Sequence, residues 1–277
     1  MTFLDKLRRA RTKTNSLLCI GLDTDWRTVP DFMHVHENPV LEFNRAIIDA
    51  TKDIACAYKL NMAYYEAYGE AGIPAVHRTL SRIPDHCLTI GDVKRGDIGN
   101  TSDQYAFTYQ EYFGFDAITI NPLMGYDAVE PYLRRKEQGV FFLALTSNPG
   151  AQDFEYLELK NGKRLYEEIT DKVREWNEPM QNCGIVVGAT KADELRALRE
   201  RAPELPFLIP GIGAQGGSLE DVLEANGEGE ALINSSRAII KASTKEDFAE
   251  AAREVALKVV QEMRELSPLL SRAAVAV

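Results

Sequence analysis

The sequence predicts one (β/α)8 TIM barrel that takes up the whole chain, residues 1–277. Eight apolar runs of strand length recur along the chain, and stretches with an apolar period of 3.6 residues lie between successive runs. The length also suits a barrel, which typically needs about 250 residues. A doubly wound open sheet is the alternative arrangement of the same alternating units.

The eight runs have the length and apolar character of buried strands. They are residues 17–23, 54–61, 87–94, 116–121, 139–146, 183–189, 206–211 and 230–236. The stretches between them are predicted to be helices that pack one apolar face on the strands. Clear examples are VLEFNRAIIDATKD, AYYEAYGEAGIPAVHRTL, DAVEPYLRRKEQ and KADELRALRERA.

The two ends of the chain and one long connection complete this order. A short amphipathic helix precedes the first strand, and the last helix is expected to end near Ser267 and to leave a short tail. Residues 147–182, after the fifth strand, are too long for a plain barrel loop and are predicted to hold one helix and an irregular insert. Long loops at this end of a barrel commonly carry function.

Composition and charge exclude several classes of protein. Hydrophobic residues make up 45% and charged residues 27% of the chain, a balance that excludes disordered and fibrous proteins. The formal net charge of −10 argues against nucleic acid as a partner and requires locally placed cations for any anionic substrate. The apolar run before Asp23 is too short for a signal peptide or a spanning helix, so no membrane association is predicted.

The cysteines and histidines predict no metal site. Cys19, Cys56, Cys87 and Cys183 lie far apart inside apolar runs, without CxxC spacing. We therefore expect buried, reduced thiols and a cytoplasmic protein. No carboxylate cluster accompanies the only metal-like spacing, a His-Val-His pair at residues 34–36, and no dinucleotide fingerprint is present, so neither a metal nor a cofactor is expected.

Charged residues end the first three predicted strands. Side chains alternate between the two faces of a strand, so Asp23, Lys59, Asp92 and Lys94 are all expected to point into the barrel at its carboxyl-terminal mouth. Any one of them, taken alone, is more often a solvated loop anchor. Four charges of alternating sign in a confined mouth would be costly to desolvate unless they neutralise one another, which favours an active site over a structural ion network.

The segment DVKRGDIGNT, residues 92–101, contains the end of the third predicted strand and continues into a predicted turn. Gly96 permits a tight turn, and Asp97 is a plausible cap for the next helix. An extended chain advances about 3.3 Å per residue, which places Asp97 about 10 Å beyond Lys94. Asp97 therefore cannot share the site of Lys94 without a turn or a second subunit.

Two later segments predict an anion site. The glycine-rich loop PGIGAQGGS, residues 210–218, follows the seventh strand, and NSSR, residues 234–237, follows the eighth. Loops at these two places commonly bind phosphate in this fold, through backbone amides. The Arg237 guanidinium strengthens the prediction, although a surface ion pair is the alternative role for this residue.

At this point the sequence resembles the orotidine 5′-phosphate decarboxylase family, specifically its longer prokaryotic subgroup (type 2), over nearly the whole barrel. The residues that carry the resemblance are GLD at 21–23, YKLN at 58–61, DVKRGDIGNT at 92–101, SNPG at 147–150, VGATKADEL at 187–195, PGIGAQGG at 210–217 and Arg237. The resemblance implies a TIM-barrel lyase that converts orotidine 5′-phosphate to uridine 5′-phosphate (UMP) without a cofactor, the last step of de novo pyrimidine biosynthesis. It also implies a homodimer.

The resemblance assigns the catalytic array. Lys59, Asp92, Lys94 and Asp97 match the family's alternating lysines and aspartates. In the family, the residues that match Asp97 and Thr101 enter the site from the partner subunit. Lys94 is expected to stabilise the carbanion left at C6 of the pyrimidine and to donate the proton to it.

The resemblance also assigns the binding residues. Asp23 matches the residue that binds the ribose hydroxyls, and Ser147 matches the serine that contacts the pyrimidine. Pro210, Gln215 and Arg237 match the residues that hold the phosphate.

One position departs from the family, and two other functions remain open. Ser236 precedes Arg237 where many relatives have glycine, which suggests a looser backbone approach to the phosphate. A metal-dependent sugar-phosphate decarboxylase or aldolase would need an acidic ligand where this chain has Lys59. A non-catalytic phosphate-binding barrel would have no use for aspartates in the mouth.

Overall fold

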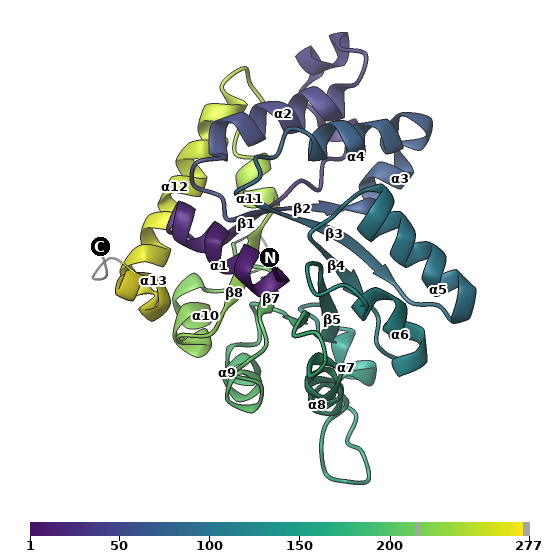
Figure 1. Cartoon of the computed structure of the whole chain (residues 1–277). Coiled ribbons are helices and arrows are strands. Elements are labelled where there is room, and N and C mark those ends of the chain that lie inside the picture. Colours follow the sequence, from purple (N-terminus) through teal and green to yellow (C-terminus); the bar gives the residue numbers. More distant parts are fainter. Residues whose placement is uncertain (214–215, 274–277) are drawn as a thin grey trace.

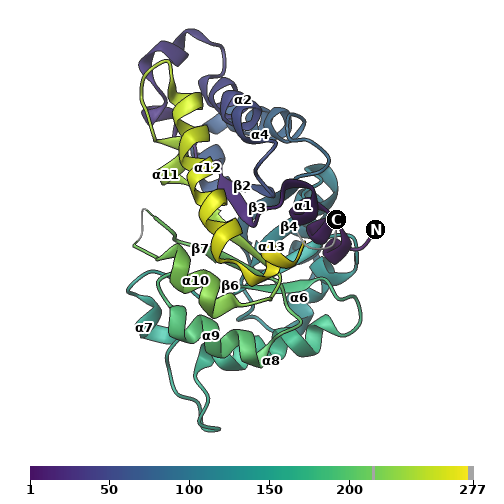
Figure 2. The ribbon, with the colours of Figure 1, turned by 90° about the vertical axis from the view of Figure 1, so that its left-hand side faces the viewer.

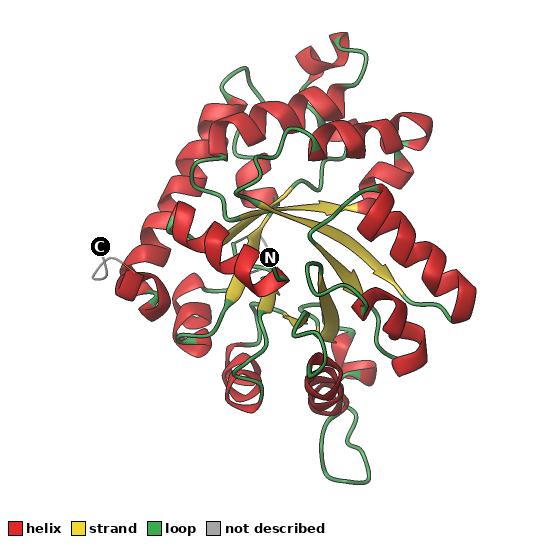
Figure 3. Ribbon diagram, in the orientation of Figure 1, coloured by secondary structure: helices red, strands yellow, loops and turns green. Residues whose placement is uncertain are grey.

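Eight parallel strands close into a barrel in the order of the sequence, and helices surround it (Figures 1 and 3). The computed structural model describes residues 1–213 and 216–273. The strands are β1 (Leu18–Gly21), β2 (Ala57–Asn61), β3 (Leu88–Arg95), β4 (Ala117–Ile120), β5 (Gly139–Leu145), β6 (Cys183–Val187), β7 (Phe207–Pro210) and β8 (Ala231–Ser235). Pairing of Leu18 with Ile233 joins β1 to β8, which confirms the barrel and excludes the open sheet.

Helices connect the strands and extend beyond them at both ends of the chain. The α-helices are α1 (Phe3–Thr14), α2 (Pro39–Thr51), α3 (Met62–Ala67), α4 (Gly72–Leu80), α5 (Gly99–Ala106), α6 (Tyr126–Leu133), α7 (Ala151–Phe154), α8 (Leu165–Asn177), α9 (Ala192–Arg201), α10 (Leu219–Asn226), α11 (Arg237–Ile240), α12 (Phe248–Leu266) and α13 (Pro268–Ala273). Short 3₁₀ turns lie at Trp26–Thr28, Asp31–Val35 and Gly69–Ala71, and a π-helical turn at Phe107–Tyr112 continues α5. None of the described helices is long and apolar enough to cross a membrane.

The strands bury their two faces in two separate apolar cores. Leu18 and Ile20 of β1 pack outward into the large core between barrel and helices, whereas Cys19 packs inward with Ala57 and Ile90. This alternation agrees with the sequence prediction: Leu22 also packs outward, and Asp23, the second residue after β1, faces the mouth. The four cysteines are buried and unpaired.

Helix α1 closes the amino-terminal end of the barrel. Its apolar face (Phe3, Leu7 and Ala10) belongs to the inner core, and the Phe3 ring packs edge-on against Phe141 of β5 with 5.8 Å between centroids. Ion pairs from Lys6 to Asp116 (2.7 Å) and from Arg11 to Glu230 (3.2 Å) tie the helix to the starts of β4 and β8. Figure 2 shows α1 at the end of the barrel opposite α7 and α11.

The structure differs from the sequence prediction in three places. The helical stretch predicted across residues 63–80 is divided, because Gly69 adopts a left-handed φ of 67° between α3 and α4. The connection after β5 holds the one-turn helix α7 as well as α8, joined by a loop that projects beyond α8 (Figure 1). The predicted tail after Ser267 begins with another helix, α13.

Replacement of Phe3 by alanine tests whether α1 stabilises the barrel by closing its amino-terminal end. Phe3 is fully buried, so Phe3→Ala is expected to lower the free energy of unfolding by about 3–5 kcal/mol. Phe154→Ala, which removes a ring that is 67% exposed on α7, is the control and should change stability by less than about 0.5 kcal/mol. Urea denaturation measures both values, and equal effects would contradict the assignment.

Candidate active site

A cavity of about 280 Å³ lies at the carboxyl-terminal ends of the strands. Seven of the residues predicted from the sequence line it: Asp23, Lys59, Asp92, Lys94, Ser147, Pro210 and Arg237. They come from six strands or the loops that follow them, so the closure of the barrel brings together residues more than 200 positions apart. This mouth is where barrel enzymes have their active sites.

Four of these residues form a continuous chain of ion pairs. Lys59 Nζ lies 3.3 Å from Asp23 Oδ1 and 3.0 Å from Asp92 Oδ2. The other oxygen of Asp92 lies 2.5 Å from Lys94 Nζ. The Lys59 side chain is only 5% exposed, whereas that of Lys94 is 49% exposed. Lys94 is therefore the end of the array that a molecule in the cavity can reach.

The array holds its inner members in their charged states. Burial alone would lower the pKa of Lys59, but the carboxylates of Asp23 and Asp92 outweigh it and raise that pKa above its usual range. Burial alone would raise the pKa of Asp92, but the ammonium groups of Lys59 and Lys94 hold it well below its usual range. The Cys19 thiol beneath them is neutral, because burial raises its pKa to about 12.

The end of β3 is bulged at the array. Between the Gly91–Ile118 and Arg95–Ile120 pairs, β3 has three residues where β4 has one, Thr119. Lys94 adopts a left-handed φ of 46°, which is unfavourable for a residue with a side chain. The bulge keeps Asp92 and Lys94 together on the cavity side, as the sequence predicted, but through a backbone that alternation alone did not predict.

The Thr119 hydroxyl holds this bulge. Its oxygen accepts hydrogen bonds from the backbone N–H groups of Val93 and Lys94, both at 3.0 Å, and its proton is donated to Asp92 Oδ1 at 2.9 Å. The side chain is 1% exposed. One hydroxyl thus supports both the left-handed residue and its ionic partner.

Arg95 fixes the other side of the bulge. Its guanidinium pairs with Glu66 and donates to the Tyr109 hydroxyl at 2.8 Å. It also lies over the rings of Tyr105 and Tyr109, about 5.5 Å from each centroid. The strand that carries Lys94 is therefore anchored to α3 and α5 immediately after the unusual residue.

The opposite rim of the cavity is formed by loops after β5, β7 and β8. Ser147 and Pro210 lie there, with Arg237 exposed at the start of α11. Ser236 fits without a glycine conformation, since its φ is −113°, and its side chain occupies the space beside Gly21, where an added Cβ would lie 1.8 Å from Ser236 Oγ. Gly21 therefore accommodates the departure at Ser236. Gln215 lies outside the described residues.

Two predicted residues do not line this cavity. Asp97 follows the turn after β3 and accepts a hydrogen bond from the Ile98 N–H at 2.8 Å, and Thr101 is exposed on α5. Ile98, not Asp97, is the residue that precedes the first turn of α5, so the side chain of Asp97 is not the cap of that helix. Apolar side chains are exposed at Ile98 (56%) and, after β4, at Leu123 (63%) and Met124 (48%); a Cβ added at Gly96 would lie 4.0 Å from Met124 Sδ, so the two segments are neighbours.

The sequence analysis missed several polar residues of the cavity. These are Asn61, Thr119, Thr146, Asn148 and Asn234. Thr119 has the clearest signal, because it shares the inward face of its strand with Ala117 near the end of the fourth run. In the described part of the chain no group of three or more His, Cys, Asp or Glu residues could hold a metal ion.

A closed eight-stranded barrel with alternating lysines and aspartates at its carboxyl-terminal mouth defines the class of this protein as a barrel enzyme. Comparison with protein families gives the particular one. Residues 16–255 match the model of the orotidine 5′-phosphate decarboxylase / HUMPS family, and the chain belongs to this family.

Curated relatives and solved structures agree with this assignment. An orotidine 5′-phosphate decarboxylase of Herpetosiphon aurantiacus is 48% identical over 92% of this chain and 95% of its own, and one of Dehalococcoides mccartyi is 46% identical over the same shares. The structure of Leishmania donovani OMP decarboxylase matches with a TM-score of 0.84 and 33% identity over 96% of this chain and 98% of that chain. Leishmania donovani UMP synthase matches with a TM-score of 0.82 and 36% identity over 94% of this chain, which spans 56% of that longer protein.

Two substitutions of Thr119 test its support of the bulge. Thr119→Val removes the hydroxyl, leaves two buried backbone N–H groups without an acceptor and leaves Asp92 Oδ1 with Lys94 alone, so we expect a loss of about 3 kcal/mol in the free energy of unfolding. Thr119→Ser keeps the hydroxyl and loses a methyl group, which should cost about 1 kcal/mol. Chemical denaturation measures both, and a valine variant as stable as the serine variant would show that the hydroxyl does not hold the bulge.

Proposed function

We propose that this protein decarboxylates orotidine 5′-phosphate to UMP, the last step of de novo pyrimidine biosynthesis, with Lys94 as the residue that stabilises the C6 carbanion and protonates it. The observation that carries the proposal is the array Asp23–Lys59–Asp92–Lys94, with its half-exposed ammonium group facing the cavity. The curated relatives named for this reaction, similar over nine-tenths of the chain, support the same chemistry here.

The array suits a reaction that creates a negative charge on carbon. Loss of CO₂ from C6 leaves a carbanion with little resonance stabilisation, so a fixed cation must stand where the charge develops. Lys94 is held there by Asp92, which is itself held by Lys59 and Thr119. The ammonium group needs no reorganisation when the charge forms, and it has the proton that the carbanion takes up.

Repulsion between Asp92 and the substrate carboxylate contributes a smaller part. Two like charges at 4 Å cost about 4 kcal/mol at an effective dielectric constant of 20. Enzymes commonly lower barriers by about 8–23 kcal/mol, so repulsion alone is insufficient. The remainder comes from stabilisation of the carbanion and from binding energy at the ribose and phosphate.

The remaining residues place the nucleotide across the mouth. Asp23, next to Lys59, binds the ribose hydroxyls, and Ser147 on the opposite rim contacts the pyrimidine. Arg237, with Pro210 and Gln215, holds the phosphate. The position of Arg237 supports this orientation. Its exposed guanidinium lies at the rim of the cavity that the array also lines, although the two are far apart in the sequence.

The proposal includes a cytoplasmic homodimer with shared sites. Asp97 and Thr101 lie outside the cavity of their own chain, beside the exposed apolar side chains of Ile98, Leu123 and Met124. An apolar surface of this kind, next to a polar residue required by the chemistry, is typical of a symmetric interface. The unpaired, buried thiols support the cytoplasmic location.

Replacement of Lys94 tests the mechanism. Lys94→Ala is expected to reduce kcat by at least about 10³-fold, because the ammonium group acts on charge that forms only in the transition state, while UMP still binds. Decay of orotidine 5′-phosphate absorbance, measured in excess chelator, reports turnover. Near-normal turnover of the variant would remove Lys94 from the mechanism, and wild-type activity that needs an added divalent ion would favour the metal-dependent alternative.

Subunit exchange tests the shared site. Lys94→Ala and Asp97→Ala chains, each inactive alone, are mixed under conditions that exchange subunits. If the partner's Asp97 completes each site, a mixed dimer has one intact site, and random mixing should restore roughly a quarter of wild-type activity. Activity that stays at the level of the parents would show that Asp97 serves its own chain.

A further inference from the structure

Glu155, in the insert after β5, contacts the wall of the cavity in a way that the proposed function does not use. We propose that Glu155 of this insert is a positioning residue: its carboxylate fixes the segment 146–148, and thereby Ser147, at the pyrimidine end of the site. The inference rests on the proposed function, because it deepens the role given there to Ser147.

The Glu155 carboxylate binds Thr146 with both oxygens. Oε2 accepts the Thr146 backbone N–H at 2.7 Å, and Oε1 accepts the Thr146 hydroxyl at 2.8 Å. Thr146 is the first residue after β5, and it lines the cavity together with Ser147 and Asn148. Hydrogen bonds to an ionised acceptor are about twice as strong as neutral ones. The two bonds fix the backbone and the side chain of the residue that precedes Ser147.

The insert also holds Glu155 in place. The Glu155 N–H donates to the Ala151 carbonyl at 2.9 Å, and the Glu155 carbonyl accepts the N–H of Tyr166 at 3.0 Å. The residue is thus joined on one side to α7 and on the other to the first turn of α8. A shift of its backbone would strain or break one of these two hydrogen bonds.

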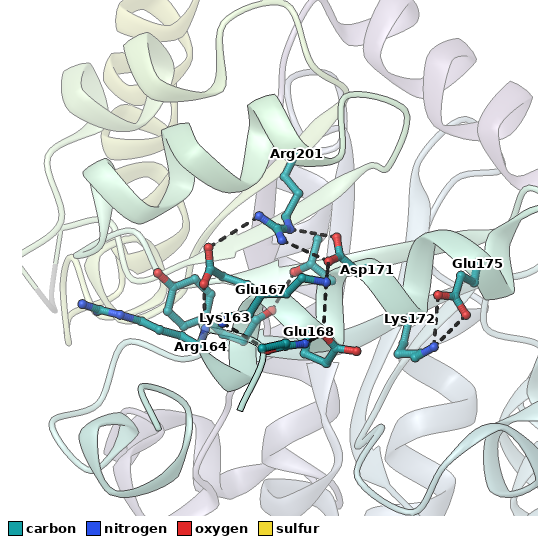
Figure 4. A network of polar contacts seen from close by, with 11 residues as sticks. Lys163, Arg164, Glu167, Glu168, Asp171, Lys172, Glu175 and Arg201 are labelled. Atoms are coloured by element: carbon teal, nitrogen blue, oxygen red, sulfur yellow. Dashed lines mark hydrogen bonds and ion pairs between the residues drawn. The ribbon is translucent and has the colours of Figure 1, made fainter. Parts of the chain in front are cut away.

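An ion-pair network secures the distal loop of the insert to α8 and α9 (Figure 4). Lys163 Nζ lies 2.7 Å from Asp171, and Arg201 of α9 binds the same carboxylate at 2.8 Å. Arg201 also reaches Glu167 at 3.5 Å. These charges are partly exposed, so each pair is weak alone, but together they join the loop to two helices that pack on the barrel.

Strand β6 constrains the same segment from its other side. The Gly188 N–H donates to the Leu145 carbonyl at 2.9 Å. A Cβ added at Gly188 would lie 2.8 Å from Ser147 Cα, so the two backbones are in direct contact. The segment 146–148 therefore lies between a fixed carboxylate and a close backbone, and loss of Glu155 removes the constraint on the side of the insert that acts directly on Thr146.

The hydrogen bonds of the Thr146 hydroxyl indicate which substitution of Glu155 is tolerated. It has one proton and two neighbours, Glu155 Oε1 at 2.8 Å and Asn148 Oδ1 at 2.7 Å. In Glu155→Gln the new amide can donate to the hydroxyl oxygen, while the hydroxyl donates to Asn148 and the remaining glutamine oxygen accepts the Thr146 N–H. Glutamine can therefore preserve the arrangement, whereas alanine cannot.

The experiment compares two ligands and three variants. UMP occupies the ribose, phosphate and pyrimidine parts of the site, whereas ribose 5-phosphate lacks the pyrimidine. Glu155→Ala is expected to lower kcat/KM for orotidine 5′-phosphate by about 10- to 100-fold and to weaken UMP binding about tenfold, with less than about a twofold change for ribose 5-phosphate. Glu155→Gln should restore all three values to within about threefold of wild type.

A matched control and a stability measurement separate positioning from folding. Glu158 lies in the same insert and is exposed, so Glu158→Ala should leave kcat/KM and both affinities within about twofold of wild type. Thermal unfolding verifies that each variant is folded at the assay temperature. Equal losses of UMP and ribose 5-phosphate affinity in folded Glu155→Ala, or no loss of either, would overturn the inference. Wild-type protein that neither turns over orotidine 5′-phosphate nor binds UMP would instead overturn the proposed function.

Discussion

The buried ammonium group of Lys59 is the constraint on which the active site depends. A cation that is 5% exposed is tolerated only if carboxylates compensate for the water it has lost, and Asp23 and Asp92 do so from the strands on either side. The registers of β1, β2 and β3 therefore have to place the carboxyl-terminal ends of the three strands at the same level along the barrel axis. Once they do, the second oxygen of Asp92 is available to hold Lys94 at the open end of the array.

Unfavourable local geometry near the array is balanced by neutral groups. The left-handed backbone of Lys94 costs about 1–2 kcal/mol, and the Thr119 hydroxyl offsets it with bonds to two successive N–H groups. Ser236 has a side chain where the backbone passes close to β1, and the absent Cβ of Gly21 provides its space. The charged residues are thus held by a framework of small polar and small apolar residues, which fixes their orientation without adding charge.

Sequence patterns predicted the barrel and the charged array because both follow from simple periodicities. Inward alternation and the common direction of parallel strands suffice to bring Asp23, Lys59 and Asp92 together. Alternation places Thr119 on the inward face of β4, but a hydroxyl on an apolar strand is too common to single out as a site residue, and one glutamate in an irregular insert, Glu155, gives no signal at all. The sequence did not predict the bulge in β3 either, because the bulge depends on contacts with β4 and not on a local motif.

The closure of the barrel by α1 has a consequence for how the chain is made. Helix α1 is synthesised more than 200 residues before Glu230, at the start of β8, and it can complete its contacts only when that residue has been made. The carbonyls of Thr14 and Asn15, at the end of α1, accept hydrogen bonds from the guanidinium of Arg264, which is synthesised later still. Until β8 has been synthesised, the apolar face of α1 and the inward faces of the earlier strands therefore cannot complete the inner core. Long-range closure of this kind slows folding, and it leaves nascent chains with apolar surface that chaperones can bind.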